Sequence, residues 1–171
     1  MAGSPAGALR VEALGSQHDR NSFTSGVEPL DRYFHIQAGQ DARKNIAAPF
    51  VLVLPDGGIG GYYTLSSTAV KLATLPDNVV RRLPRYPFVP ATLLGKLAID
   101  TRFQGRGYGR FLLADALFRA VRSEIASFAV IVDAKNDAAR RFYERENFLP
   151  FPDEPMKLFR PMADLAKLFR T

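Results

Sequence analysis

The sequence of 171 residues contains no cysteine and only two histidines. Without cysteine there is no disulfide, no thiolate ligand for a metal and no cysteine nucleophile. The two histidines, His18 and His35, lack the spacing of a metal-binding pair, so we treat both as ordinary and predict no metal site. Any chemistry must therefore come from other side chains or from the backbone.

Long hydrophobic runs are also absent, since none approaches the roughly 18 residues of a membrane-spanning helix. The first residues lack both a basic start and an apolar segment, so we predict a flexible tail over residues 1–8 rather than a secretion signal. A cytoplasmic location is expected. The 47% hydrophobic content suits one globular domain over residues 1–171.

Positive charge is in excess, because the 23 Lys and Arg residues outnumber the 17 Asp and Glu residues and give a net charge of +6. Such a balance favours an acidic partner, and nucleic acid is the commonest one. The same charge also lies in the range that simply keeps a small domain soluble. Both interpretations stay open on charge alone.

The hydrophobic patterns alternate between strand-like and helix-like periods. In the first half we predict a strand over 9–14, a helix over 28–38 with a second short helix over 40–44, and a hairpin of strands 50–54 and 59–67. The proline-rich segment 75–91 is predicted to be a loop.

The second half has the pattern of a crossover unit, in which a strand over 93–99, a glycine loop, a helix over 110–124 and a strand over 128–132 follow one another. The two strands of such a unit lie parallel. Asn136 or Asp137 can cap a helix through Glu146, with Asn147 as a left-handed stop. A last strand over 156–160 completes an α/β (α+β) fold, with a mixed, mostly antiparallel sheet of six or seven strands and about four helices.

The glycine loop has the composition of a pyrophosphate site: Gln104-Gly105-Arg106-Gly107-Tyr108-Gly109. Glycines let the backbone turn tightly against a ligand, and the helix that follows presents unpaired amides and a positive dipole end. Arg106 and Arg110 are possible charge partners, because cations at a helix start are unfavourable without an anion.

Three segments together resemble the GNAT superfamily of acyl-CoA-dependent N-acetyltransferases. They are Leu97-Ala98-Ile99-Asp100, the glycine loop, and Asn136 followed seven residues later by Tyr143 in Phe142-Tyr143-Glu144. A closer similarity is to the toxin acetyltransferases of bacterial toxin-antitoxin modules, which acetylate the amine of aminoacyl-tRNA. It includes Ser25-Gly26, Leu30-Asp31, the segment 61–66, Arg85-Tyr86-Pro87 and the segment 94–98.

The resemblance implies a GNAT fold with a splayed parallel pair of strands and a site for acetyl-CoA. Backbone groups of Leu97, Ala98 and Ile99 would hold the pantetheine arm, and Tyr143 would be the general acid that protonates the leaving sulfur. Tyr143 could instead be a core residue, and Asn136 a helix cap only. The further cofactor-binding residues implied are Gln104, Gly105, Arg106, Gly107, Tyr108, Gly109, Arg110, Asn136 and Phe142.

Many relatives of this kind have a glutamate base five residues before the asparagine, where this chain has Ile131. The missing base matters less if the acceptor is an α-amine, with a pKa of about 7.7 to 8.0, than if it is a lysine side chain, with a pKa of about 10.4. Direct attack by a neutral amine in a ternary complex is then adequate.

Basic residues are the candidates for contact with RNA, although each could also be a solvated surface residue. Lys96 interrupts an apolar strand, so we expect it to face a groove near the acceptor end of tRNA. The resemblance also implies a homodimer and a cognate antitoxin of the ribbon-helix-helix type. The remaining candidates for RNA contact are Arg81, Arg82, Arg85, Arg43 and Lys44.

Other functions remain as alternatives. A dinucleotide-dependent oxidoreductase would need a glycine where Arg110 stands. A GNAT enzyme for a protein N-terminus or a small amine, and a catalytically silent module that binds RNA or a partner, share the same fold.

Overall fold

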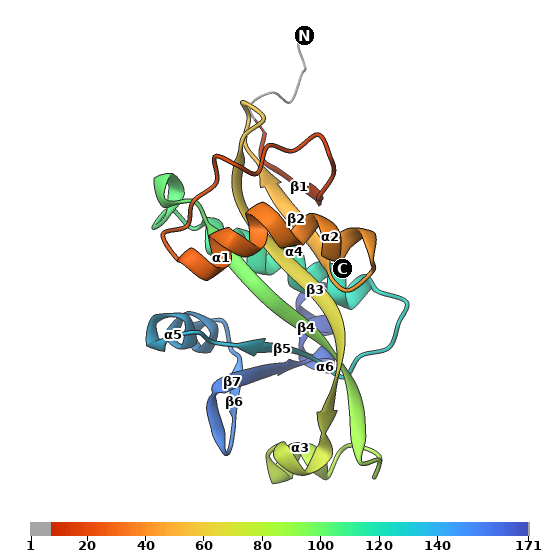
Figure 1. The fold of residues 1–171 in the computed structure, drawn as a ribbon. Helices are drawn as coiled ribbons and strands as arrows, with labels where there is room; N and C mark the ends of the chain where they lie inside the picture. The colour runs from red at the N-terminus through yellow and green to blue at the C-terminus, as the bar shows by residue number, and fades with distance from the viewer. Residues whose placement is uncertain (1–7, 171) are drawn as a thin grey trace. The chain divides into compact units, whose positions relative to one another are not determined.

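The computed structural model describes residues 8–170, which form a seven-stranded sheet with the order β1-β2-β3-β4-β5-β7-β6 (Figure 1). β4 (Phe88–Ile99) and β5 (Ala129–Asp133) are parallel, whereas the β1–β2, β2–β3, β5–β7 and β6–β7 pairs are antiparallel. The predicted mixed sheet with one parallel pair is confirmed. Residues 1–7 of the predicted tail lie outside the described part.

The chain divides into two compact units. The first consists of residues up to Ser66 together with Gly95–Ala116, and the second of Ser67–Leu94 together with the chain from Leu117 onwards. β3 and β4 therefore contribute residues to both units. The expectation of a single acyltransferase domain stays a prediction.

The first unit begins with a strand and a continuous helical segment. The predicted helix over 28–38 is longer than expected, because α1 passes through a π-helix over Tyr33–Gln37 into α2 without a break. Its elements are β1 (Arg10–Ala13), α1 (Glu28–Arg32), α2 (Ala38–Arg43), β2 (Ala48–Val53), the first part of β3 (Ile59–Lys71), the end of β4 and the start of α4 (Tyr108–Arg122).

Aromatic residues dominate the core of the first unit. Phe34 and Ala38, four residues apart on one helical face, are both fully buried. The ring of Phe34 stacks on that of Tyr62 with 4.4 Å between centroids, and the Tyr62 hydroxyl donates to the carbonyl of Leu30 at 2.7 Å. α1 and α2 thereby cover one face of β2 and β3, and α4 begins on the other (Figure 1).

The second unit is built on the β5–β7–β6 ladder. Val70, Ala91, Ile131 and Phe159 are among the residues of its buried core. The elements are the end of β3, α3 (Asp77–Val80), the start of β4, the end of α4, β5, α5 (Asp137–Arg145), β6 (Leu149–Phe151), β7 (Glu154–Pro161) and α6 (Met162–Leu168).

One predicted boundary is wrong in this unit, and one strand was not predicted. The loop over 75–91 ends early, because β4 already begins at Phe88, where Val89 and Ala91 are buried and Phe88 and Pro90 are exposed. That alternation is a strand pattern in which Pro90, lacking an N–H, still accepts from Phe128 through its carbonyl at 2.9 Å. β6 was not predicted, since three residues carry too little periodicity.

None of the described helices has the length and apolar character needed to cross a membrane. The longest, α4, has 15 residues and carries charged side chains along its length.

Candidate active site

The end of β4 offers free backbone on one side. The ladder with β5 covers only Thr92–Leu94, so β5 takes none of the backbone groups of Leu97, Ala98 and Ile99. On β3, a Cβ at Gly61 would lie 2.8 Å from the carbonyl oxygen of Ala98, so only glycine allows this close approach. An extended ligand with amide groups can pair with backbone of this kind.

The glycine loop has the conformation that its sequence predicts. Gly105 and Gly107 have φ values of 76° and 85°, in the left-handed region that favours glycine. The N–H groups of Gly105, Arg106 and Gly107 donate to no described residue. Because α4 begins at Tyr108 and adds its own unpaired first-turn amides, the loop is a ready anion site made of backbone.

Side chains of the same unit pack against each other around this loop. The ring of Tyr108 meets that of Phe103 edge to face at 6.0 Å, and the Arg106 guanidinium lies 5.8 Å from the Phe103 centroid. Arg106 and Arg110 are both exposed at the start of α4, where they add positive charge. Gly109 lies in the first turn of the helix rather than in the loop.

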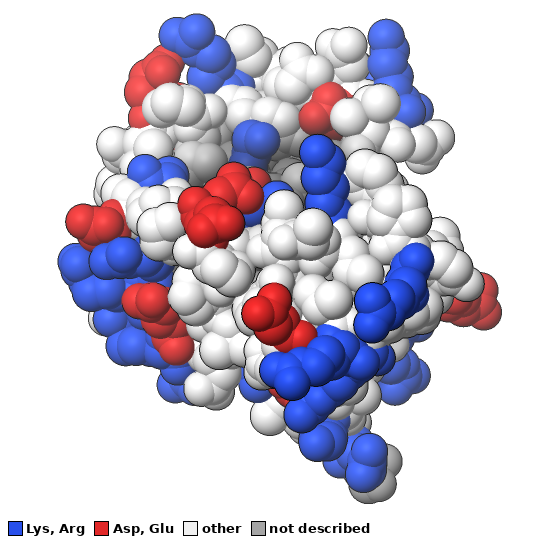
Figure 2. Space-filling model, turned by 90° about the horizontal axis from the view of Figure 1, so that it is seen from below, with Lys and Arg blue, Asp and Glu red and all other residues white. Residues whose placement is uncertain are grey.

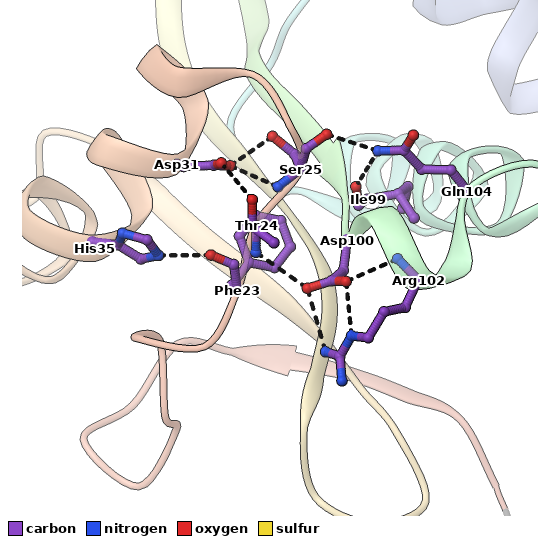
Figure 3. A network of polar contacts seen from close by, with 9 residues as sticks. All are labelled: Phe23, Thr24, Ser25, Asp31, His35, Ile99, Asp100, Arg102 and Gln104. Atoms are coloured by element: carbon purple, nitrogen blue, oxygen red, sulfur yellow. Dashed lines mark hydrogen bonds and ion pairs between the residues drawn. The ribbon is translucent and has the colours of Figure 1, made fainter.

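Gln104, predicted to bind the cofactor, has a different set of contacts (Figure 3). Its side-chain amide donates to the carbonyls of Ser25 and Ile99, both at 2.8 Å. It thereby ties the loop to the segment before α1 and to the end of β4. Binding of a ligand by Gln104 stays a prediction, while its positioning of the loop is observed.

Asp100 is the centre of this network and was not predicted as a site residue. Its fully buried carboxylate accepts from the backbone of Thr24 at 3.1 Å and from the backbone and Nε of Arg102 at 3.0 and 2.9 Å (Figure 3). Burial alone would raise its pKa, but these hydrogen bonds and the Arg102 charge hold the pKa below the ordinary value.

Asp31 makes a second anchor on the same segment. It accepts from the backbone of Ser25 at 2.8 Å, from the Ser25 hydroxyl at 2.6 Å and from the Thr24 hydroxyl at 3.1 Å. Burial opposes ionisation, yet these donors lower the pKa of Asp31. His35 adds a 2.7 Å bond to the Phe23 carbonyl, so segment 23–25 is held at three successive residues. The Ser25-Gly26 and Leu30-Asp31 pairs were the only sequence signal for this arrangement.

Tyr143 lies on α5 in the second unit and is 7% exposed. Its ring contacts Phe142 and Phe148 with centroid distances of 5.1 and 5.4 Å. The hydroxyl has no hydrogen-bond partner among the described residues, and its oxygen is not one of the buried polar atoms that lack a partner, so it is accessible from the surface. Burial raises its pKa well above the ordinary value, so the phenol stays protonated at neutral pH.

Of the two predicted capping residues, Asn136 caps α5, by accepting from the backbone of Ala139 at 2.8 Å. Its side-chain NH₂ has no partner among the described residues, so the cap leaves two donors available. Asn147 ends the helix region with φ of 69°, which confirms the left-handed stop.

Lys96 is only partly exposed, and its ammonium lies 4.2 Å from the ring centroid of Tyr33. Tyr33 in turn donates to Asp41 at 2.8 Å. The pKa of Asp41 is lowered, first by the hydrogen bonds from Gln37 and Tyr33 and further by the charge of Lys96. Lys96 is therefore held in a polar cluster within its own unit.

The arginines predicted to contact RNA lie on exposed surface. Arg81, Arg82 and Arg85 follow α3, and Arg85 lines a groove of about 600 Å³ together with Lys71, Tyr86 and Phe88. Arg43 and Lys44 are exposed at the end of α2 in the first unit. Figure 2 shows that the Lys and Arg side chains on one face gather in groups, with acidic residues between them.

Comparison with known proteins gives consistent matches. Residues 20–148 match the acetyltransferase (GNAT) family. The chain is 38% identical over 157 residues to the tRNA-acetylating toxin of Mycobacterium tuberculosis, covering 91% of this chain and 93% of that protein.

Two solved structures are also similar. AtaT in complex with acetyl-methionyl-tRNAfMet has a TM-score of 0.87 and 29% identity, over 95% of this chain and all of that one (100%). A tyrosine-to-phenylalanine mutant of the AtaT toxin, bound to the C-terminus of the antitoxin AtaR and acetyl-CoA, has a TM-score of 0.81 and 25% identity, over 95% and 99%.

Proposed function

Because the chain belongs to the GNAT acetyltransferase family, we propose that it transfers the acetyl group of acetyl-CoA to the α-amino group of aminoacyl-tRNA. The observation that carries this proposal is the 38% identity, over nearly the full length, to a tRNA-acetylating toxin. An acetylated α-amine can no longer attack a peptidyl ester, so such an enzyme blocks translation and acts as a toxin.

The glycine loop fits the pyrophosphate of coenzyme A. Its three free N–H groups and the first turn of α4 match the charge and the hydrogen-bonding capacity of such a group. A Cβ at Gly105 or Gly107 would meet no atom within 4 Å, so the loop is open to a ligand. We assign the pantetheine arm to the backbone of Leu97–Ile99 that β5 leaves unpaired, apart from the Ile99 carbonyl, which accepts from Gln104.

Acetyl-CoA supplies an acetyl thioester, whose sulfur must leave when the amine attacks. Tyr143 is the residue to which we assign protonation of that sulfur. Its raised pKa keeps the proton available, and its unpaired hydroxyl competes with no internal acceptor. Asn136 is assigned to hydrogen-bond the cofactor through its free NH₂ group.

No side chain is required as a general base. Ile131, where related enzymes carry glutamate, is buried and apolar. An α-amine with a pKa of about 7.7 to 8.0 is partly neutral at pH 7, whereas a lysine amine is almost wholly protonated. The absence of a base thus favours an α-amine over a lysine side chain as the acceptor.

The partners follow from the same proposal. AtaT was solved with tRNA and with the C-terminus of its antitoxin, so we expect a cognate antitoxin for this chain too. The ribbon-helix-helix type, the homodimer and a cytoplasmic site of action stay predictions.

Radiolabelled acetyl-CoA incubated with the protein and bulk charged tRNA tests the proposal. We expect label on the aminoacyl moiety, released as N-acetyl-amino acid when mild base cleaves the ester. Deacylated tRNA is the matched control and should take up no label. Charging one tRNA at a time then identifies the aminoacyl group.

The alternatives give distinct outcomes in the same assay. Label on polyamines or on peptide N-termini, with none on charged tRNA, would assign the enzyme to another acceptor. No label on any amine, with acetyl-CoA binding absent in calorimetry, would show a silent module.

A further inference from the structure

A cavity of about 370 Å³ lies beside α2 in the first unit. One wall is the turn Leu14–Ser16 after β1, and the other is α2 with Gly39, Ala42 and Arg43. Arg20 completes the lining. The Lys96 cluster and the glycine loop contribute no residue to it.

Two guanidinium groups meet in this cavity. A Cβ placed on Gly39 would lie 3.1 Å from Nη1 of Arg20 and 3.3 Å from Nη1 of Arg43. The two nitrogens are therefore closer to each other than the Debye length of about 8 Å at physiological ionic strength. Two cations at this separation repel each other unless an anion lies between them.

No described acidic group provides that anion. Neither Arg20 nor Arg43 forms an ion pair with a described residue. Arg20 donates once, to the Phe34 carbonyl at 3.2 Å, so most of its five N–H groups remain available. Glu12, on the preceding strand, is engaged by Arg10 and His18, both at 2.7 Å.

Gly39 keeps the space between the guanidinium groups open. Glycine is less favourable than alanine inside a helix, so its presence in α2 is a local disadvantage. Its φ is not positive, and no turn requires glycine here. A methyl group at this position would lie 3.1 and 3.3 Å from the two guanidinium groups, which would have to move apart by a few tenths of an ångström.

The opposite wall is rigid. The Gly15 N–H donates to Nδ1 of His18 at 2.9 Å, so the other ring nitrogen carries the proton and donates to Glu12. The His18 side chain is 4% exposed. The adjacent Ser16 has a hydroxyl and an N–H that donate to no described residue. The turn thus presents free donors towards the cavity that Ser16 lines.

We propose that Arg20 and Arg43 form a phosphate site that binds a backbone phosphate of the tRNA substrate. Guanidinium groups present paired donors that match phosphate oxygens, and the Ser16 hydroxyl can add one more donor. The neighbouring Lys44 adds an exposed cation for the adjoining backbone. This inference rests on the proposed function for the identity of the RNA, while the phosphate chemistry rests on the cavity alone.

Binding of uncharged tRNA, measured by fluorescence anisotropy over a range of salt concentrations, tests the site without any turnover. Arg43→Gln should raise the Kd about 5- to 10-fold and lower the slope of log Kd against log salt by about one phosphate contact, that is 0.7 to 0.9. Arg32→Gln is the matched control. It removes the same charge from an exposed i,i+4 pair on α1 and should leave Kd within about two-fold.

Gly39→Ala separates the site from a structural role. The variant should unfold at a higher temperature, because alanine favours the helix, yet bind tRNA more weakly because the methyl group crowds the arginines. A purely structural Gly39 would give the first effect without the second. The tRNA Kd of Arg20→Gln is compared with that of the wild type only if the two proteins have the same melting temperature.

Two further titrations distinguish a phosphate of tRNA from a phosphate of acetyl-CoA as the ligand of this site. Acetyl-CoA affinity should be the same in Arg43→Gln and wild type, and inorganic phosphate at millimolar concentration should compete with tRNA in the wild type more than in the variant. Loss of acetyl-CoA affinity would instead assign the arginines to the cofactor. Unchanged tRNA affinity and salt slope in both Arg43→Gln and Gly39→Ala would overturn the site, even if the wild type acetylates aminoacyl-tRNA.

Discussion

Tyr143 combines burial with an unpaired hydroxyl, and this pair of properties is what a proton donor needs. The Tyr143 oxygen is not one of the buried atoms that lack a partner, so it can meet water or a ligand. The hydroxyl has no hydrogen-bond partner among the described residues, although the ring is enclosed by Phe142 and Phe148. The unpaired hydroxyl supports the catalytic role of Tyr143, which stays a prediction.

Tyr143→Phe should lower kcat by about 10²- to 10³-fold and change the Kd for acetyl-CoA by no more than about two-fold. The substitution removes only the oxygen, so the ring contacts with Phe142 and Phe148 are kept. Single-turnover rates and calorimetry measure the two quantities separately. An unchanged rate would exclude Tyr143 as the acid.

The protonation state of Tyr143 also determines how the rate of the wild type should depend on pH. Burial raises the pKa of Tyr143, so the acid form persists through neutral and mildly basic pH. The rate should therefore rise with pH as the amine of the acceptor loses its proton, and Tyr143 should cause no decline below about pH 10.

The glycine loop has its conformation and its position fixed by its own residues and their contacts. Its conformation depends on Gly105 and Gly107, and its placement depends on Gln104, whose amide bridges Ser25 and Ile99. The loop is thus fixed before a ligand arrives, which reduces the ordering cost of binding. The charges of Arg106 and Arg110 then add to a site whose geometry is already set by backbone.

Gly107→Ala should weaken acetyl-CoA binding about 10-fold, because a left-handed residue with a Cβ costs about 1 to 2 kcal/mol and the loop can escape that strain by moving. Gly57→Ala is the matched control. Gly57 has φ of 89°, also has open space for a Cβ and lies in the β2–β3 turn. It should lose similar stability in urea unfolding but keep the wild-type Kd. Equal Kd values for both variants would contradict the role of the loop.

On the scale of the whole molecule, Asp100 connects residues that lie 76 positions apart in the sequence. Its pKa is below the ordinary value in the folded state, so the ionised form stabilises the fold above the unfolded pKa of about 3.9. That stabilisation is lost as the pH falls through the lower folded pKa. Asp31 contributes in the same direction.

Asp100→Asn should reduce the free energy of unfolding by about 1 to 3 kcal/mol at pH 7, since the buried acceptor loses its charge and one of its oxygens. Its stability should also fall less than that of the wild type as the pH drops below about 3.9, because the unfolded wild type then binds a proton at Asp100 while the folded form, with its lower pKa, stays ionised. Urea titrations at several pH values measure both effects. Asp153→Asn, at an exposed turn position, is the control and should match the wild type throughout.

Much of the fold could be predicted because it depends on local patterns. The alternation in strands, the Asn136 cap and the left-handed Asn147 are set by neighbouring residues and were confirmed. The early start of β4 was missed because Pro84, Pro87 and Pro90 indicate a loop, whereas pairing with distant strands decides the outcome. β6 was missed for the related reason that its three residues form a strand only beside β7.

The sequence by itself determined the conformation of the glycine loop, the helix cap and the family, because glycine conformations, helix starts and motif order need no distant contact. Only the tertiary structure decided which polar groups meet. The bonds from Asp100 to Thr24 and from Gln104 to Ser25, and the approach of Arg20 to Arg43 over Gly39, join residues from separate segments. Residue spacing along a chain does not specify distances between segments, so these contacts arise only when the core brings the segments together.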